Sequence, residues 1–107
     1  QILAACEAAA QGEVVAPVNF NSPGQVVIAG HTAAVERASA LCKEAGAKRA
    51  LPLPVSAPFH TSLMRPAADR LAAQIQATSF SAPQVPVIHN VSAQPEMDPE
   101  KIKALII

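Results

Sequence analysis

A short turn between two apolar runs restricts the fold of the first half of this chain more than any other feature. The turn, Asn21-Ser22-Pro23-Gly24, holds Pro followed by Gly. Pro sets its own φ near about −65° and Gly accepts positive φ, as a type II turn requires. The runs on either side, 14–19 and 25–29, are therefore predicted to be the two strands of a hairpin. Pro17 lies inside the first run and favours an edge or irregular strand there.

Helical patterns enclose this hairpin. Apolar residues at helical spacing cover 1–10 and stop at Gly12, and a second stripe begins after Thr32, a candidate N-cap, and ends at Gly46. Leu51, Leu53 and Val55 then alternate with prolines, which predicts a further strand over 48–55. With one strand placed before the first residue, the order becomes βαββαβ, a ferredoxin-like split βαβ arrangement.

The second half of the chain is predicted to belong to a different layer of the protein. It shows a helix over 62–78 with Ser62 able to cap it, a strand over 85–91, and a helix that begins at Pro99 with Asp98 as N-cap. We therefore expect an α/β (α+β) fold in two parts, residues 1–55 and residues 56–107.

Composition excludes several classes of protein. Half of the residues are hydrophobic, 15% are charged and the net charge is +0. Scattered basic residues and three Phe without Trp or Tyr argue against a nucleic-acid binder, and no apolar run approaches the roughly 20 residues of a membrane span. We expect a soluble, cytoplasmic protein. Cys6 and Cys42 lie outside any paired metal-ligand motif and are expected to be buried thiols.

The hydrophobic composition also predicts that something else covers part of the surface. Gln1 opens directly into a helical pattern with no capping residue before it, and the chain closes on apolar Leu105-Ile106-Ile107 without a helix stop signal. We therefore expect a piece of a longer protein.

His60 is the candidate catalytic residue. It lies where Pro58 breaks the period-two run and where an apolar stripe of helical spacing begins at Leu63. A short, stiff connector between two regular elements is a common place for a catalytic side chain. Neutral imidazole titrates near working pH, so it is suited to general base catalysis.

Two runs carry a resemblance to a known family. They are Asn19-Phe20-Asn21-Ser22-Pro23-Gly24-Gln25-Val26-Val27-Ile28-Ala29-Gly30-His31 and Val55-Ser56-Ala57-Pro58-Phe59-His60-Thr61-Ser62-Leu63-Met64. Together they closely resemble the malonyl-CoA:acyl carrier protein transacylases of bacterial fatty-acid synthesis. The resemblance covers nearly all of this chain but only part of the family's sequence. The chain has no Gly-His-Ser-x-Gly nucleophile motif.

The resemblance implies a reaction and a set of residues. A malonyl group passes from malonyl-CoA to the pantetheine thiol of acyl carrier protein through a covalent malonyl-Ser intermediate, and His60 matches the family's catalytic base. Phe59 would point toward the acyl pocket, and Asn21 would line the active site. The resemblance also implies that 1–55 is a small ferredoxin-like subdomain, that 56–107 is part of a large α/β hydrolase-like subdomain, and that the parent protein is a monomer. No metal or other cofactor is needed, because the coenzyme A thioester is itself a substrate. These 107 residues alone are expected to be inactive, because the nucleophile lies outside them.

Two other interpretations stay open. A non-catalytic ferredoxin-like module that binds a small ligand or a protein fits the pattern of the first half, although such a module should end near Val55. An acyltransferase domain of a polyketide synthase is the other. His31 and His89 are expected to be structural, since neither has an acidic or Cys partner at metal-ligand spacing. Several basic residues could meet an acidic carrier protein through rim charges or simply be solvated: Lys43, Lys48, Arg49, Arg65 and Arg70.

Overall fold

The predicted hairpin forms the sheet of the first of two units, residues 1–65 and 66–107, into which the computed structural model divides all 107 residues. In the first unit, helix α1 (Ile2–Ala10) precedes strands β1 (Val15–Ser22) and β2 (Gln25–Gly30), and helix α2 (Thr32–Glu44) follows. β1 and β2 pair antiparallel. Gly24 has φ 84° at the second turn position, as the Pro-Gly pair predicts.

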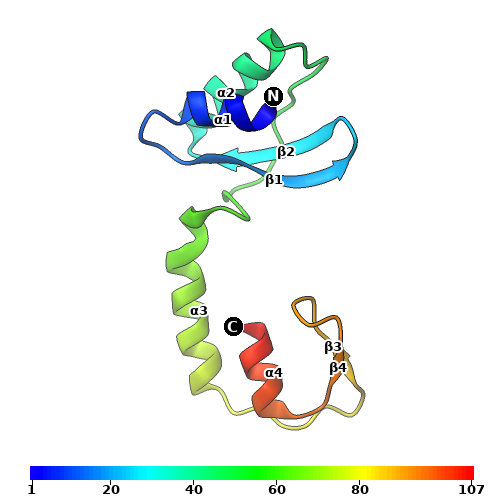
Figure 1. Cartoon of the computed structure of the whole chain (residues 1–107). Helices are drawn as coiled ribbons and strands as arrows, with labels where there is room; N and C mark the ends of the chain where they lie inside the picture. The colour runs from blue at the N-terminus through cyan, green and yellow to red at the C-terminus, as the bar shows by residue number, and fades with distance from the viewer. The chain divides into compact units, whose positions relative to one another are not determined.

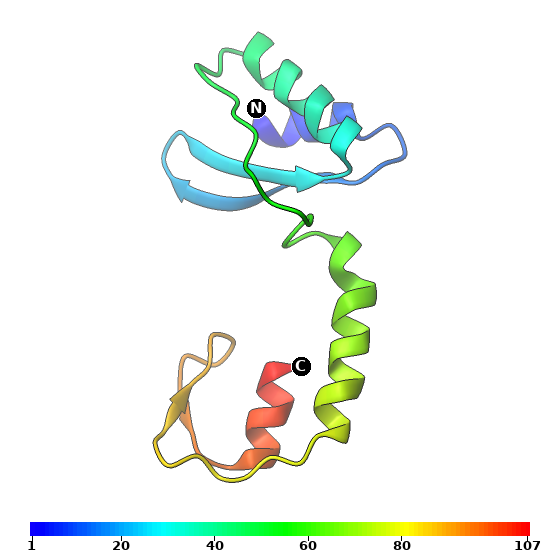
Figure 2. The same cartoon turned by 180° about the vertical axis from the view of Figure 1, so that it is seen from behind.

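Small side chains build the core of the first unit. Both views show α1 and α2 on the same face of the hairpin (Figures 1 and 2). Ala side chains let two helices approach closely, which suits a core with few large residues. The buried cluster consists of Cys6, Ala9, Val15, Ala34 and Ala38.

The two cysteines differ in their environment. Both are free thiols; Cys6 is buried with 1% of its surface exposed, whereas Cys42 is only partly buried. Burial is the main cause of a raised pKa of the Cys6 thiol, because a thiolate would lose its solvation there. Cys6 is therefore the buried small residue that the sequence predicts, and Cys42 is so only in part.

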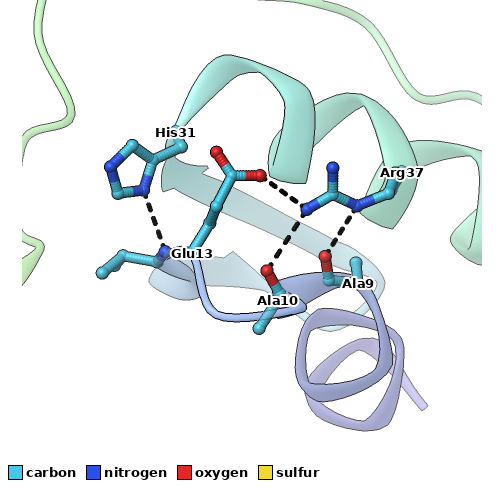
Figure 3. Close-up of polar contacts among 6 residues, drawn as sticks. Ala9, Ala10, Glu13, His31 and Arg37 are labelled. Atoms are coloured by element: carbon cyan, nitrogen blue, oxygen red, sulfur yellow. Dashed lines mark hydrogen bonds and ion pairs between the residues drawn. The ribbon is translucent and has the colours of Figure 1, made fainter.

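Polar contacts of Arg37 join α2 to the end of α1 (Figure 3). Its Nε donates to the carbonyl of Ala9 at 2.9 Å, and one Nη donates to the carbonyl of Ala10 at 3.2 Å. The same Nη lies 2.7 Å from Oε1 of Glu13. The last carbonyls of a helix have no partner within the helix, so Arg37 satisfies groups that α1 cannot satisfy itself.

The junction of β2 with α2 is held by a reciprocal contact with the start of β1. The Val14 amide donates to Nδ1 of His31 at 2.9 Å, and the His31 amide donates to the Val14 carbonyl at 2.8 Å. Gly30 is required by this close approach: a Cβ there would lie within 2.7 Å of the backbone of Val14 and Val15. His31, and not Thr32, is the N-cap of α2, because its extended backbone (ψ 140°) precedes the first helical residue.

The strand predicted over 48–55 is wrong for this structure. The segment has no regular structure and pairs with neither hairpin strand. Pro52 and Pro54 remove the amide donors from one edge of the segment, and the Val55 amide donates to the Leu53 carbonyl at 2.8 Å. The alternating apolar side chains face solvent instead, as the 70% exposure of Leu51 illustrates.

The second unit contains most of helix α3 (Arg65–Ala77), strands β3 (Val87–Ile88) and β4 (Pro95–Glu96), and helix α4 (Pro99–Ile106). β3 is far shorter than the strand predicted over 85–91, and it pairs with β4, which the sequence did not indicate. α4 begins as predicted, with the Asp98 carboxylate accepting from the amides of Glu100 and Lys101.

Lys103 connects α4 to the end of α3 within the second unit. Its ammonium donates to the Gln76 carbonyl at 3.1 Å and lies 5.7 Å from the centre of the Phe80 ring. Ile102 is the single buried residue of this unit, so its core is slight. No helix of the chain has the length and apolar character needed to cross a membrane.

We expect Arg37→Met to lower the free energy of unfolding by about 1.5 to 3 kcal/mol, since it removes the hydrogen bonds that a charged donor makes to the Ala9 and Ala10 carbonyls. Urea unfolding followed by far-ultraviolet circular dichroism measures the change. Arg49→Met is the matched control, because Arg49 is exposed and makes no hydrogen bond or ion pair. Equal unfolding midpoints for the two variants would contradict the role assigned to Arg37.

Candidate active site around His60

The segment before α3 is a succession of tight turns set by proline. The Phe59 amide donates to the Ala57 carbonyl at 3.0 Å across Pro58, and the Val55 amide makes the equivalent bond across Pro54. The fixed φ of Pro is close to that of the central residue of an inverse γ-turn, so each Pro favours the turn that it occupies. These turns lead directly to His60.

His60 adopts a left-handed backbone conformation, with φ 64°. The conformation costs an L-residue other than Gly about 1 to 2 kcal/mol, although His tolerates it better than most residues. The residue is exposed, and no hydrogen bond within the chain engages its imidazole. A strained backbone that presents a free imidazole is a reason to suspect function.

Thr61 joins the two sides of His60. Its hydroxyl donates to the Pro58 carbonyl at 2.7 Å and accepts from the Leu63 amide at 3.3 Å. Through the second bond Thr61 caps a 3-10 turn, Ser62–Met64, that runs into α3. The cap is therefore one residue earlier than Ser62, the residue that the sequence indicated.

The other two candidate residues, Phe59 and Asn21, lie at different places relative to His60. Phe59 is next to His60 and 48% exposed, so its ring is available to a ligand or to another part of a protein. Asn21 lies near the end of β1, is exposed, and makes no hydrogen bond to His60. The structure thus brings Phe59 to His60 but does not join Asn21 to them. The strain at His60 and the hydroxyl of Thr61 were not anticipated; Thr after His, just before a helical pattern, was the available signal for a cap.

Other polar groups form weaker candidates. His31 is occupied by its contact with Val14, as a structural histidine should be. Nε2 of His89, just after β3, is buried without a partner. No group of three His, Cys, Asp or Glu residues is placed to hold a metal ion. A shallow, open depression of ≈ 270 Å³ beside α4 contains no nucleophile, and its residues are Gln76, Glu100, Lys103, Ala104 and Ile107.

The Glu96 carboxylate accepts two hydrogen bonds from the backbone that follows it. The backbone amides of Asp98 and Met97 donate to it and lower the pKa of its carboxyl group. This contact orders the turn before α4 and brings no second catalytic group to it. His60 therefore remains the side chain best placed for proton transfer.

Comparison with known proteins gives a consistent result. The chain is 61% identical over 106 residues to the malonyl CoA-acyl carrier protein transacylase of Salmonella typhimurium, covering 99% of the chain and 34% of the relative. It is 48% identical over 97 residues to the protein of that name from Bacillus subtilis, covering 91% of the chain and 31% of the relative. No family model matches the chain.

Solved structures agree with these relatives. A crystal structure of an acyl carrier protein S-malonyltransferase from Vibrio cholerae superimposes with a TM-score of 0.74 at 67% identity, covering 98% of this chain and 34% of that one. A malonyl-transacylase in complex with its type II PKS acyl-carrier protein gives a TM-score of 0.77 at 56% identity, again over 98% and 34%.

The mixed α/β fold and the sequence therefore match one part of proteins that are named for acyl transfer. More closely, the chain belongs to the malonyl CoA-acyl carrier protein transacylase family, as the two sequence runs predicted. The chain spans about a third of the length of the curated relatives that it matches.

We expect His60→Gly to be more stable than His60→Ala by about 1 kcal/mol, because Gly accepts positive φ without the cost that Ala bears. Both variants lack the imidazole, so urea unfolding of the pair isolates the backbone term. The same pair at Ser62, where φ is not positive, should show the opposite order. If the Ala and Gly variants at position 60 have equal free energies of unfolding, the left-handed conformation is not held in solution.

Proposed function

We propose that these residues are part of a malonyl-CoA:acyl carrier protein transacylase in which His60 is the general base. The observation that carries the proposal is the exposed, unpaired imidazole of His60 on a strained turn. It lies in a chain that is 61% identical to a protein named for this activity. The identity supports the reaction class, and the geometry supports the choice of residue.

Each half-reaction is a proton-coupled acyl transfer. In the first, His60 accepts the hydroxyl proton of a Ser nucleophile as its oxygen attacks the thioester carbonyl of malonyl-CoA. The tetrahedral intermediate then collapses, the carbon–sulfur bond breaks, and the departing thiol of coenzyme A receives the proton from the imidazolium. In the second, His60 takes the proton of the pantetheine thiol and the thiolate attacks the malonyl ester. The carbon–oxygen bond to the Ser then breaks, and the Ser oxygen receives the proton from the imidazolium.

The chain supplies only part of this machinery. It has no Gly-His-Ser-x-Gly motif, so we propose that the nucleophile comes from the remaining length seen in the relatives. The thioester provides the driving force for transfer, and neither half-reaction involves a change in oxidation state. We therefore propose that the reaction uses malonyl-CoA and acyl carrier protein without a further cofactor, in a monomeric cytoplasmic enzyme.

Phe59 and Asn21 are proposed to bind substrate. Phe59 precedes the base directly, and its ring is half exposed, so it can form one wall of an acyl pocket beside the imidazole. The Asn21 side chain is exposed and free of hydrogen bonds within the chain, so its amide can donate to and accept from a bound thioester. Asn21 needs the rest of the enzyme to complete such a site.

The fold of the parent protein is proposed to complete the first unit. We propose that 1–55 is a ferredoxin-like subdomain in which 48–55 pairs through its free edge with a strand from outside this chain. Pro52 and Pro54 leave one edge of this segment without amide donors. The opposite edge still has the amides of Leu51 and Leu53, whose side chains are exposed. Residues 56–107 are proposed to belong to a larger, hydrolase-like α/β subdomain.

A second kind of carrier protein is a candidate acceptor of the malonyl group. One structural relative, at 56% identity, was solved with a type II PKS acyl-carrier protein. This similarity favours a carrier protein of polyketide synthesis as an alternative thiol acceptor for the same malonyl-enzyme. Assaying both kinds of carrier protein distinguishes the two.

We expect His60→Ala to reduce malonyl transfer to holo acyl carrier protein by about a hundred to ten thousand fold, the usual loss when a general base is removed. Intact-mass spectrometry of the carrier protein, with the full-length enzyme, measures the transfer. His31→Asn is the matched control, because an Asn oxygen can replace Nδ1 as acceptor from the Val14 amide. Undiminished transfer by His60→Ala would remove His60 as the base, and no transfer by wild type would favour a non-catalytic binding module.

We expect Phe59→Ser to raise the ratio of methylmalonyl to malonyl transfer by about tenfold, because the ring occupies space that an α-methyl group requires. Discrimination of one methyl group is limited to roughly 1 to 3 kcal/mol, so the variant should still use malonyl-CoA. Competition between the two thioesters, read by carrier-protein mass, measures the ratio. Phe20→Ser controls for loss of an exposed Phe elsewhere in the first unit, and an unchanged ratio would place Phe59 outside the acyl pocket.

A further inference from the structure

Thr61 is the only residue whose side chain holds together the backbone on both sides of His60. Its hydroxyl donates to the carbonyl of Pro58, two residues before His60, at 2.7 Å. The same oxygen accepts from the amide of Leu63, three residues after His60, at 3.3 Å. A hydroxyl has one donor and two acceptor positions, so one group can make both contacts at once.

The conformation of His60 requires such a restraint. A φ of 64° lies outside the preferred backbone conformations of an L-residue, and it persists only where the surrounding structure restrains it. No other side-chain hydrogen bond spans the turn from Pro58 to Leu63. The donated bond also has the short distance typical of a good O–H···O hydrogen bond.

From this geometry we propose that Thr61 is a positioning residue for the imidazole of His60. The proposal rests on His60 being the base of the proposed transacylase. Without the hydroxyl, the Pro58–Thr61 turn is free to relax toward ordinary φ values, and the imidazole moves away from the direction in which the turn presents it. Thr61 acts through the backbone of His60 and does not need to touch the substrate.

Three full-length variants test the proposal by steady-state malonyl transfer. Thr61→Val keeps the shape of the side chain without the hydroxyl, and we expect kcat to fall by about 10- to 100-fold, the loss that a displaced catalytic group causes. Thr61→Ser keeps the hydroxyl and should stay within about threefold of wild type. Ser62→Ala removes the neighbouring hydroxyl, which makes no hydrogen bond, and should leave kcat unchanged.

The kinetic pattern separates positioning from a general loss of structure. KM for malonyl-CoA should stay within about twofold in Thr61→Val, and its pH–rate profile should keep the wild-type midpoint at a reduced height, because the imidazole itself is unaltered. If Thr61→Val fails to fold, Thr61→Gly replaces it, since Gly is well tolerated at a helix N-cap and equally removes the hydroxyl.

The outcomes also separate this inference from the proposed function. Wild-type kcat in a folded Thr61→Val or Thr61→Gly variant, with His60→Ala still inactive, would overturn the role of Thr61 alone. A Thr61→Ser variant as slow as Thr61→Val would overturn it too, because the hydroxyl would then not be the group that matters. Full activity of His60→Ala would instead refute the assignment of the base.

Discussion

Contact between two alanine-rich helices over a hairpin is the constraint on which the first unit depends. Ala34 and Ala38 of α2 and Ala9 of α1 are buried in one cluster, so the helices can lie close enough for Arg37 to reach the last carbonyls of α1. The guanidinium is well suited to this task, because its several N–H donors point in different directions within one plane. Larger core residues would separate the helices and break the hydrogen bonds from Arg37 to those carbonyls.

Local signals in the sequence predicted much of this architecture. Gly12, the Pro23-Gly24 pair and Gly46 end or reverse elements through their own backbone preferences, and each lies where the structure ends or reverses an element. The strand over 48–55 failed because alternation reports only which side chains share a face. Pairing depends on a partner strand, and the segment finds none here.

The sequence selects a candidate base for the site but does not indicate its geometry. His60 could be selected from its place after Pro58 and from the run that resembles a known family, and the comparisons confirm the family. The left-handed backbone at His60 has only a weak signal, because His adopts positive φ far less readily than Gly. The bond from Thr61 to Pro58 likewise depends on how consecutive turns place a hydroxyl near a carbonyl.

The prolines of the segment before His60 have a consequence for the behaviour of the chain in solution. Leu51, Leu53 and Val55 are exposed in an alternating run that resembles a sheet edge. Runs of this kind recruit other chains into intermolecular sheets. Pro52 and Pro54 leave one side of the run without amide donors, so it is able to pair on one edge only and is a poor template for growth into aggregates.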